Sequence, residues 1–403
     1  MTGKSFIHPR DLRGLAKLVT QATEGVTDVV ESMHRNIARS PLLPADREQK
    51  RTSGITGLVY QSIRGVNALV GEGLERLLAS IEPMVPANAS NSQREAIVSV
   101  LNGVLGDHLE ASGNPLAIPM RLRFEGEALK FPLPEEQQAR IQPGKRILIG
   151  VHGLCMNDLQ WQRKSHNHLQ ALADETGYTP LALHYNSGRH ISVNGQAFAL
   201  LLDQLHRYWP EPIDSIVIVG HSMGGLVTRS ALDHAARMKM NWLDRTDKIF
   251  MLGSPHHGAP LEKAGNVLER VLDISRYSSP LVALGQIRSA GITDLRHGSI
   301  LDSDWESAHR FERVINHRQI VPIPEGVAAY TIAGVHGKAT GVHEHIVGDG
   351  LVPLSSALGD SDDPRYRLNI PQSRKSVYYE THHMALLDHP EIAEQLKCWM
   401  NAE

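Results

Sequence analysis

Residues 213–225 read Ile213-Asp214-Ser215-Ile216-Val217-Ile218-Val219-Gly220-His221-Ser222-Met223-Gly224-Gly225. The apolar first half predicts a buried strand, and the apolar spacing from Leu226 to Ala235 predicts a helix directly after it. A serine with glycines two positions before and two positions after it fits the sharp strand-to-helix turn that exposes a nucleophilic hydroxyl. Ser222 is therefore the candidate nucleophile.

Further strands are predicted on both sides of this stretch. Residues 121–124 and 128–131 indicate a β-hairpin around Glu125-Gly126. Short apolar runs separated by helical stretches follow at Ile147–Val151, Leu181–Tyr185, Ile216–Val219, Ile249–Leu252, Tyr330–Gly334 and Ser376–Tyr379. Continuous apolar strands of this length are typical of a parallel sheet covered on both faces. The sequence therefore predicts an α/β fold with a mostly parallel central sheet.

A second signature follows the strand at Ile147–Val151, where the chain reads His152-Gly153-Leu154. A glycine here lets the chain turn so that the next backbone N–H points at a reacting carbonyl. We expect the amides of Leu154 and Met223 to form an oxyanion hole, each contributing about 3 kcal/mol in the transition state. His152 is interpreted as a structural hydrogen-bonding residue, with a catalytic role left open.

A serine nucleophile needs a base and an acid that orients the base. The last predicted strand is followed by His382-His383-Met384-Ala385-Leu386-Leu387, where His383 stands three residues before an apolar pair. This spacing favours His383 as the base, with His382 as the alternative. Asp349 is the favoured acid because its flanking glycines let the loop bend, and Glu344 is the alternative. Residues Asp360, Asp362 and Asp363 are interpreted as solvated charges.

Other side chains are predicted to line the substrate site. His256 and His257 follow a predicted strand and are expected to shape the pocket beside Ser222. Tyr185 follows another strand on the same rim, where ligands of open α/β sheets bind. The alternative for the Tyr185 loop is an ordinary connection. No histidine cluster has zinc-ligand spacing, so we expect neither a metal nor another cofactor.

Taken together, four motifs resemble those of α/β-hydrolase lipases and esterases. They are His152-Gly153-Leu154, Gly220 to Val227, Gly253-Ser254-Pro255-His256-His257-Gly258 and Gly348-Asp349-Gly350-Leu351-Val352-Pro353. The chain is most similar to bacterial members related to GPI inositol-deacylase-like hydrolases and triacylglycerol lipases. The resemblance covers residues 118–400 and implies an α/β-hydrolase fold. It also implies carboxylic-ester hydrolysis through an acyl-enzyme with Ser222, Asp349 and His383 as the triad.

This resemblance does not extend to the N-terminal part, where residues 1–117 are predicted to be helical. Apolar stripes at helical spacing run from Leu12 to Ile37 and from Ile55 to Ile81, and a capping pattern opens a third helix at Ser92. These helices are expected to pack on the catalytic domain or a sister helix, with docking on a membrane or hydrophobic particle as the alternative. Residues 118–403 form the predicted catalytic domain, with a helical cap inserted at about 258–328.

Composition limits the remaining possibilities. The 403 residues are 41% hydrophobic and 21% charged, as in soluble globular proteins, and the net charge of -3 gives no reason to expect a nucleic-acid partner. Two cysteines make no disulfide framework, and no secretory signal or apolar run of about 20 residues is present. We therefore predict a cytoplasmic protein, with export by another route and oligomerisation left open.

The predicted activity is that of a serine hydrolase of the carboxylesterase or triacylglycerol lipase type, acting on an ester or lipid substrate. Two alternatives remain at this point. One is an acyltransferase or thioesterase that uses the same triad. The other is a lipid-surface binding protein led by the N-terminal helices.

Overall fold

The computed structural model describes residues 92–259, 289–305, 319, 321–338 and 348–402, together with part of residues 10–21. The chain divides into two compact units, residues 1–91 with 109–117 and residues 92–108 with 118–403. Within the first unit the Asn114 side-chain amide donates to the Gly14 carbonyl at 3.0 Å. The predicted helix at residues 55–81 and most of the predicted cap lie outside the described residues, and the division at residue 118 stays a prediction.

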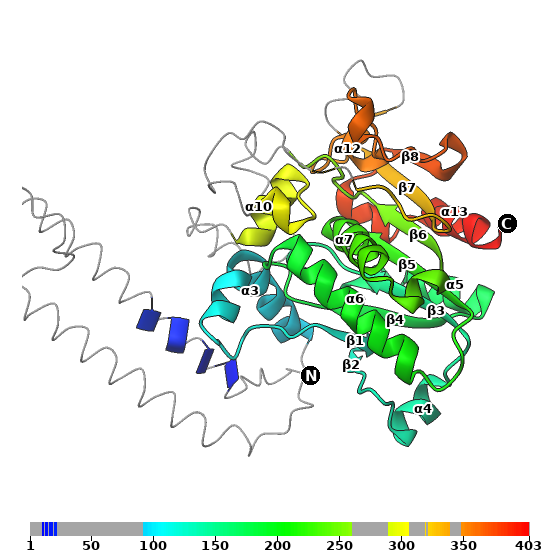
Figure 1. Cartoon of the computed structure of the whole chain (residues 1–403). Coiled ribbons are helices and arrows are strands. Elements are labelled where there is room, and N and C mark those ends of the chain that lie inside the picture. The colour runs from blue at the N-terminus through cyan, green and yellow to red at the C-terminus, as the bar shows by residue number, and fades with distance from the viewer. Residues whose placement is uncertain are drawn as a thin grey trace, which may run out of the picture. The chain divides into compact units, whose positions relative to one another are not determined.

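The second unit contains an eight-stranded sheet with the order β2-β1-β4-β3-β5-β6-β7-β8 (Figure 1). β1 pairs antiparallel with β2 and with β4, and every other pairing from β4 to β8 is parallel. The predicted strands are found, except that the second strand of the hairpin shares only Ala128 with the predicted residues 128–131. The bounds are β1 Arg121–Phe124, β2 Glu127–Ala128, β3 Arg146–Val151, β4 Thr179–His184, β5 Ser215–His221, β6 Thr246–Leu252, β7 Ala328–Val335 and β8 Lys375–Tyr379.

Helices cover the sheet on both faces. The described α-helices are α3 Ser92–Ala111, α4 Glu135–Ile141, α5 His168–Thr176, α6 Ile191–Tyr208, α7 Met223–Met238, α10 Ala290–His297, α12 Leu354–Leu358 and α13 Pro390–Asn401. Short 3₁₀ helices connect them, at η2 Asp158–Trp161, η3 Asn241–Arg245, η5 Asp302–Asp304, η6 Pro364–Tyr366, η7 Gln372–Arg374 and η8 His383–Leu387. In Figure 1, α6 and α7 lie together in front of the sheet.

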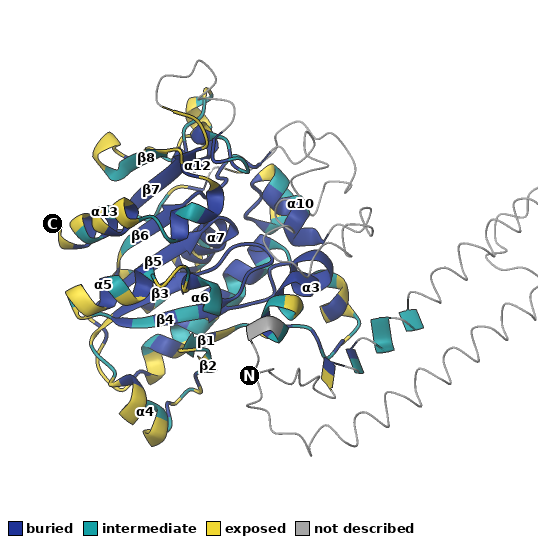
Figure 2. Ribbon diagram, turned by 180° about the vertical axis from the view of Figure 1, so that it is seen from behind, coloured by how far each residue is buried: buried dark blue, intermediate teal, exposed yellow. Residues whose placement is uncertain are grey.

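The core follows the alternation of side chains along the central strands. Val217 and Val219 of β5 pack in one apolar cluster with residues of α5 and α13, including Leu169, Leu172 and Trp399. Every residue of β5 is buried, because both faces of this strand are covered (Figure 2). A strand in this position gains nothing from polar side chains, which explains why its sequence is a continuous apolar run.

Most of α3 belongs to the same unit as the sheet. The Asn186 side-chain amide donates to the Gly106 carbonyl at 2.8 Å, and the Ser289 hydroxyl donates to the Gly103 carbonyl at 2.7 Å. The amide of Ile118 also donates to the Asn102 side chain at 2.9 Å. The first two bonds hold α3 against the loop after β4 and the start of α10, and the third joins it to the segment before β1.

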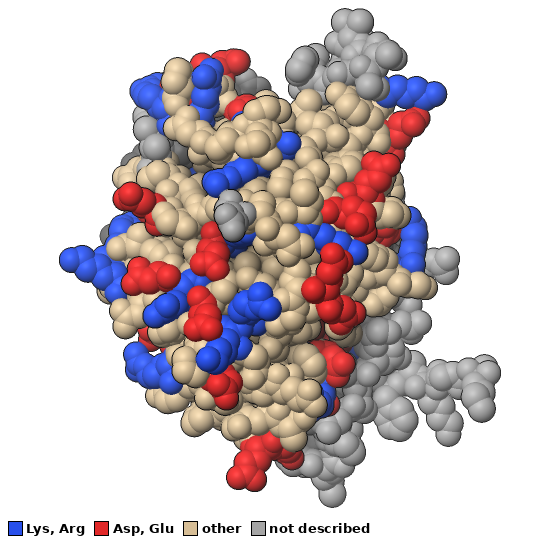
Figure 3. Space-filling view, turned by 90° about the vertical axis from the view of Figure 1, so that its right-hand side faces the viewer, with Lys and Arg blue, Asp and Glu red and all other residues tan. Residues whose placement is uncertain are grey.

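Charges of both signs occur across the face of the molecule drawn in Figure 3. None of the helices in the described part of the chain is long and apolar enough to cross a membrane. Within the same residues, no group of three histidine, cysteine or acidic side chains is arranged to hold a metal ion.

Candidate active site

Ser222 lies at the turn between β5 and α7, where the sequence predicts the nucleophile. Its φ of 53° and ψ of -121° are strained for a residue with a side chain. The amide of Ser222 donates to the Leu252 carbonyl at 2.8 Å, which fixes the turn to the end of β6. A Cβ atom on Gly224 would lie 2.1 Å from the Val151 carbonyl oxygen, so the helix can start this close to β3 only with glycine there.

Asp349 and His383 are joined by a short hydrogen bond. Nδ1 of His383 donates to Oδ2 of Asp349 at 2.6 Å, and both side chains are buried. The other carboxylate oxygen of Asp349 accepts the amides of Leu351 and Val352 at 3.0 and 2.9 Å. These donors hold the carboxylate in one orientation, and the carboxylate in turn holds the proton of His383 on Nδ1.

The end of β6 brings this pair and Ser222 to the same edge of the sheet. The residue after Leu252 is Gly253, and a Cβ atom there would lie 3.1 Å from Nδ1 and from Cε1 of His383. His221, next to Ser222, donates from Nε2 to the His383 carbonyl at 3.3 Å. Burial, reinforced by the nearby His383, holds the pKa of His221 well below its usual value, so His221 acts as a neutral donor.

The two adjacent histidines have different surroundings. His382 is exposed and precedes η8, where its Nδ1 accepts the amide of Ala385 at 3.3 Å. His383 is the one of the two that meets Asp349. The alternative acid, Glu344, lies outside the described residues. Of the acids interpreted as solvated, Asp360 pairs with Lys375 and Asp363 pairs with Arg365.

The predicted oxyanion loop, His152-Gly153-Leu154, runs beside Ser222. A Cβ atom on Gly153 would lie 3.1 Å from Cβ of Ser222. Met223 is the first residue of α7, so its amide is among those that have no acceptor within the helix. The two amides proposed as oxyanion donors, those of Leu154 and Met223, therefore stand on the two segments that flank the nucleophile.

Two residues that follow β4 brace this loop. The Tyr185 hydroxyl donates to the His152 carbonyl at 2.8 Å, and the Ser187 hydroxyl accepts the amide of Cys155 at 3.0 Å. The rings of Tyr185 and His152 stack with their centroids 4.3 Å apart. Burial lowers the pKa of His152 to about 4, so its ring is neutral near pH 7. No pattern in the sequence predicts this bracing, because it joins residues about 30 positions apart.

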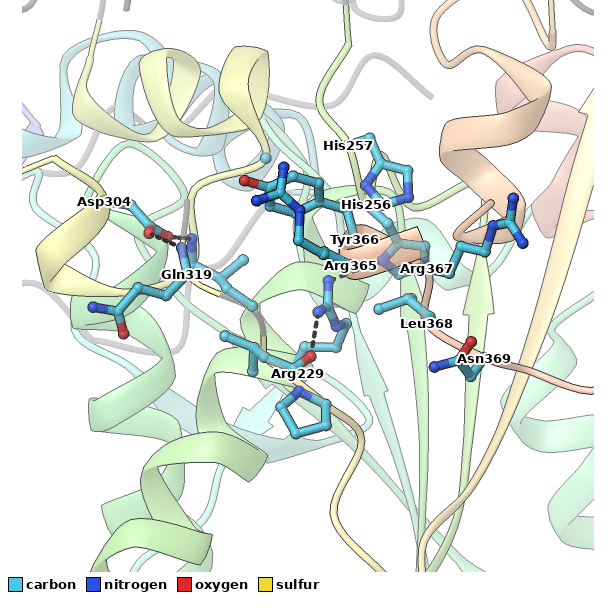
Figure 4. A pocket seen from close by; sticks show the side chains of 14 residues that line it. Arg229, His256, His257, Asp304, Gln319, Arg365, Tyr366, Arg367, Leu368 and Asn369 are labelled. Atoms are coloured by element: carbon cyan, nitrogen blue, oxygen red, sulfur yellow. Dashed lines mark hydrogen bonds between the residues drawn. The ribbon is translucent and has the colours of Figure 1, made fainter. Parts of the chain in front are cut away.

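The three predicted substrate-binding residues lie in two places. Tyr185 is only 1% exposed, and its hydroxyl donates to the His152 carbonyl in the predicted oxyanion loop. His256 and His257 line a cavity of about 110 Å³ whose lining contains neither Ser222 nor His383 (Figure 4). Substrate contact by these three residues stays a prediction.

Comparison with known proteins adds a family match. Residues 147–329 match the family model described as the PGAP1-like alpha/beta domain. This range begins in β3 and ends in β7, so it includes Ser222, whereas Asp349 and His383 follow it. No curated protein matches the chain.

Several solved structures are similar over most of the chain. The mature lipase BlEst2 from Bacillus licheniformis has 18% identity and a TM-score of 0.41, covering 70% of this chain and 96% of that one. Lipase B from Aspergillus fumigatus has 11% identity and a TM-score of 0.38, covering 67% and 58%. A thermophilic esterase from Thermogutta terrifontis has 13% identity and a TM-score of 0.36, covering 64% and 90%. This chain thus spans little more than half of the Aspergillus lipase.

Proposed function

We propose that this chain, which is an α/β hydrolase with a PGAP1-like alpha/beta domain at residues 147–329, is a serine esterase or lipase acting on carboxylic esters. The observation that carries the proposal is the 2.6 Å hydrogen bond between His383 and Asp349, at the sheet edge where the strained Ser222 turn is fixed. A buried carboxylate, an oriented imidazole and a serine on a strained turn are the three parts that acyl transfer requires.

The hydrogen bond to Asp349 determines which nitrogen of His383 acts. With the proton held on Nδ1, the lone pair is on Nε2, which accepts the proton of Ser222 as its oxygen attacks the ester carbonyl. The resulting oxyanion receives hydrogen bonds from the amides of Leu154 and Met223. The tetrahedral intermediate then expels the alcohol, which takes the proton from Nε2, and an acyl ester remains on Ser222.

Water completes the cycle by the same route. Nε2 of His383 accepts a proton from the water as its oxygen attacks the acyl carbonyl. The second tetrahedral intermediate breaks the bond to Ser222, whose oxygen takes back the proton, and the carboxylic acid leaves. Asp349 stays ionised throughout and stabilises the imidazolium that forms twice in the cycle.

The test is the Ser222→Ala variant with p-nitrophenyl esters from acetyl to long-chain acyl groups. We expect kcat to fall by at least ~10³-fold, together with loss of covalent labelling by a fluorophosphonate. Ser373→Ala, at an exposed position in η7, is the matched control and keeps both properties. Turnover by Ser222→Ala equal to that of the wild type contradicts the proposal.

The other predicted classes differ in measurable ways. An acyltransferase would pass the acyl group to an added alcohol in preference to water. A thioesterase would favour thioesters over oxygen esters when thioesters of the same acyl groups are added to the panel. Membrane contact through the N-terminal helices, cytoplasmic location and oligomerisation stay predictions. Flotation with liposomes, with the full chain, tests the first of these.

A further inference from the structure

The helix α3 contains two glycines, Gly103 and Gly106, in its interior, where glycine costs up to about 1 kcal/mol relative to alanine. Both glycines lie where the helix touches another part of the chain. A Cβ atom on Gly103 would lie 2.2 Å from Sγ of Cys155 and 2.9 Å from its Cα and N atoms. The helix can therefore approach the loop after β3 this closely only with glycine at position 103.

Cys155 directly follows Leu154, whose amide is proposed as an oxyanion donor. The amide of Met156 donates to the Gly153 carbonyl at 3.3 Å, so residues 153–156 form a β-turn with Cys155 in its third position. The φ of Cys155 is 60°, a left-handed conformation that favours glycine and is strained for a residue with a side chain. The turn keeps this conformation because its surroundings enforce it.

Two contacts hold Cys155 in this conformation. Its amide donates to the Ser187 hydroxyl at 3.0 Å, which fixes the backbone. Its sulfur lies against Gly103 and is 4.0 Å from the Val100 carbonyl oxygen on the same helix. The cysteine is only 5% exposed, and burial raises the pKa of its thiol to about 12, so the sulfur is a neutral packing group near pH 7.

The helix on the other side of this contact is itself held in place. The Ser289 hydroxyl donates to the Gly103 carbonyl at 2.7 Å. Nearer the start of α3, Glu95 lies 3.5 Å from Nη1 of Arg123, and the same nitrogen donates to Asp158 at 3.0 Å. Because Arg123 is in β1 and Asp158 begins η2, these contacts join the start of the helix to the sheet and to the segment that follows the turn.

We propose that Gly103 is a positioning residue for the oxyanion hole, because it admits the Cys155 side chain and so fixes the turn that carries the Leu154 amide. This inference rests on the proposed function, in which that amide is an oxyanion donor. In a Gly103→Ala protein the added Cβ atom presses on Cys155, and the strained turn yields before the anchored helix does. The Leu154 amide then moves away from the place where the oxyanion forms.

The proposal gives α3 a part in the chemistry. This helix, Ser92–Ala111, precedes residues 147–329, which match the family model. The residues that serve the proposed active site therefore include a helix from outside that match.

The test measures p-nitrophenyl ester kinetics of Gly103→Ala, with active sites counted by fluorophosphonate labelling carried to completion. We expect kcat per labelled site to fall by at least ~10-fold with little change in KM, because a displaced donor loses its effect on the transition state. A purely structural role would lower the number of labelled sites and leave kcat per site unchanged. Ile97→Ala is the matched control, since Ile97 is 38% exposed on the same helix, and it keeps the wild-type kinetics.

Variants of Cys155 show whether the effect passes through the sulfur. In Gly103→Ala/Cys155→Ala, the methyl group of the first alanine takes the space that the sulfur leaves. We expect kcat per site at least ~3-fold above that of Gly103→Ala. Cys155→Ala alone should lower kcat per site by about threefold or more, because the turn loses its contact with α3. This last variant tests the proposal even where Gly103→Ala does not fold.

Two results overturn the proposal and leave the proposed hydrolysis intact. One is a kcat per labelled site within about twofold of the wild type in Gly103→Ala and Cys155→Ala, or in the second alone where the first does not fold. The other is a double variant that is no more active per site than Gly103→Ala. A wild type without turnover that depends on Ser222 overturns the proposed function, and this inference with it.

Discussion

His383 donates from Nδ1 to Oδ2 of Asp349 at 2.6 Å, although 34 positions of sequence separate the two residues. A second bond joins the same pair, because the amide of His383 donates to the Asp349 carbonyl at 3.1 Å. The two residues follow β7 and β8, which pair in parallel from Thr331 opposite Lys375 to Val335 opposite Tyr379. The sheet therefore fixes both the side chain and the backbone of the proposed base against the proposed acid.

Asp349→Asn is expected to lower kcat by ~10³–10⁴-fold with little change in KM. The amide that replaces the carboxylate can donate to Nδ1, which moves the proton of His383 to Nε2 and removes the lone pair that Ser222 needs. Steady-state kinetics with a p-nitrophenyl ester measure both constants. Asp362→Asn, at an exposed position, is the control with the same chemical change. A kcat within tenfold of the wild type would mean that Asp349 does not orient the base.

His383→Ala and His382→Ala are expected to have very different effects. His383→Ala removes the base and should lower kcat by at least ~10³-fold. His382→Ala should keep activity within a few-fold, because His382 is exposed and contributes one bond to the amide of Ala385. The two variants are compared in the same ester assay. The assignment is reversed if His382→Ala is the inactive protein.

Tyr185→Phe separates bracing of the oxyanion loop from contact with substrate. The variant leaves the buried His152 carbonyl without the hydroxyl donor, which should destabilise the fold by about 1–3 kcal/mol and lower kcat by loosening the loop. Denaturant unfolding and steady-state kinetics measure the two effects. Tyr208→Phe, at a position 43% exposed, is the control and should change stability by less than about 0.5 kcal/mol. A raised KM with unchanged kcat and stability would favour substrate contact by Tyr185.

The stability of the fold is expected to fall with acidification through His168. Its Nε2 donates to the Leu386 carbonyl at 3.0 Å, and its Nδ1 lies 2.8 Å from Nε2 of His166. Burial lowers the pKa of His168 to about 4, against about 6.5 in the unfolded chain. Between these values the unfolded chain binds more protons, so the stability is full above pH 6.5 and is lost as the pH falls towards 4.

The measurement compares wild type with His168→Gln, whose amide can still donate to Leu386. The unfolding free energy of the wild type falls from pH 7 to pH 4.5. This decrease should be about 2–3 kcal/mol smaller in the variant than in the wild type. Burial raises the pKa of Asp158 to about 6, and this group stabilises the fold as the pH falls, which opposes the effect of His168. The contribution of His168 is therefore measured as the difference between the two proteins. Equal pH dependence in both proteins would remove His168 as a cause.

The local features of the fold could be predicted because each depends on neighbours in sequence. The apolar run before Gly220 predicts β5, since a strand covered on both faces needs apolar side chains throughout. The glycines around Ser222 predict the strained turn, and the turn is found with a φ of 53°. The His152-Gly153 pair after β3 likewise predicts a loop beside the proposed nucleophile, and Gly153 lies against Ser222.

The sequence alone was enough to predict most of the strands and the turn at Ser222, and to propose Ser222, Asp349 and His383 as catalytic residues. The spacing before Leu386 and Leu387 favoured His383 and left His382 open, and the packed structure shows that His383 is the one that meets Asp349. Only the tertiary structure decided that Tyr185 braces His152 and that His256 faces Arg229. Such contacts depend on how strands and helices pack, and a hydrogen bond between distant segments leaves no periodic pattern in the sequence.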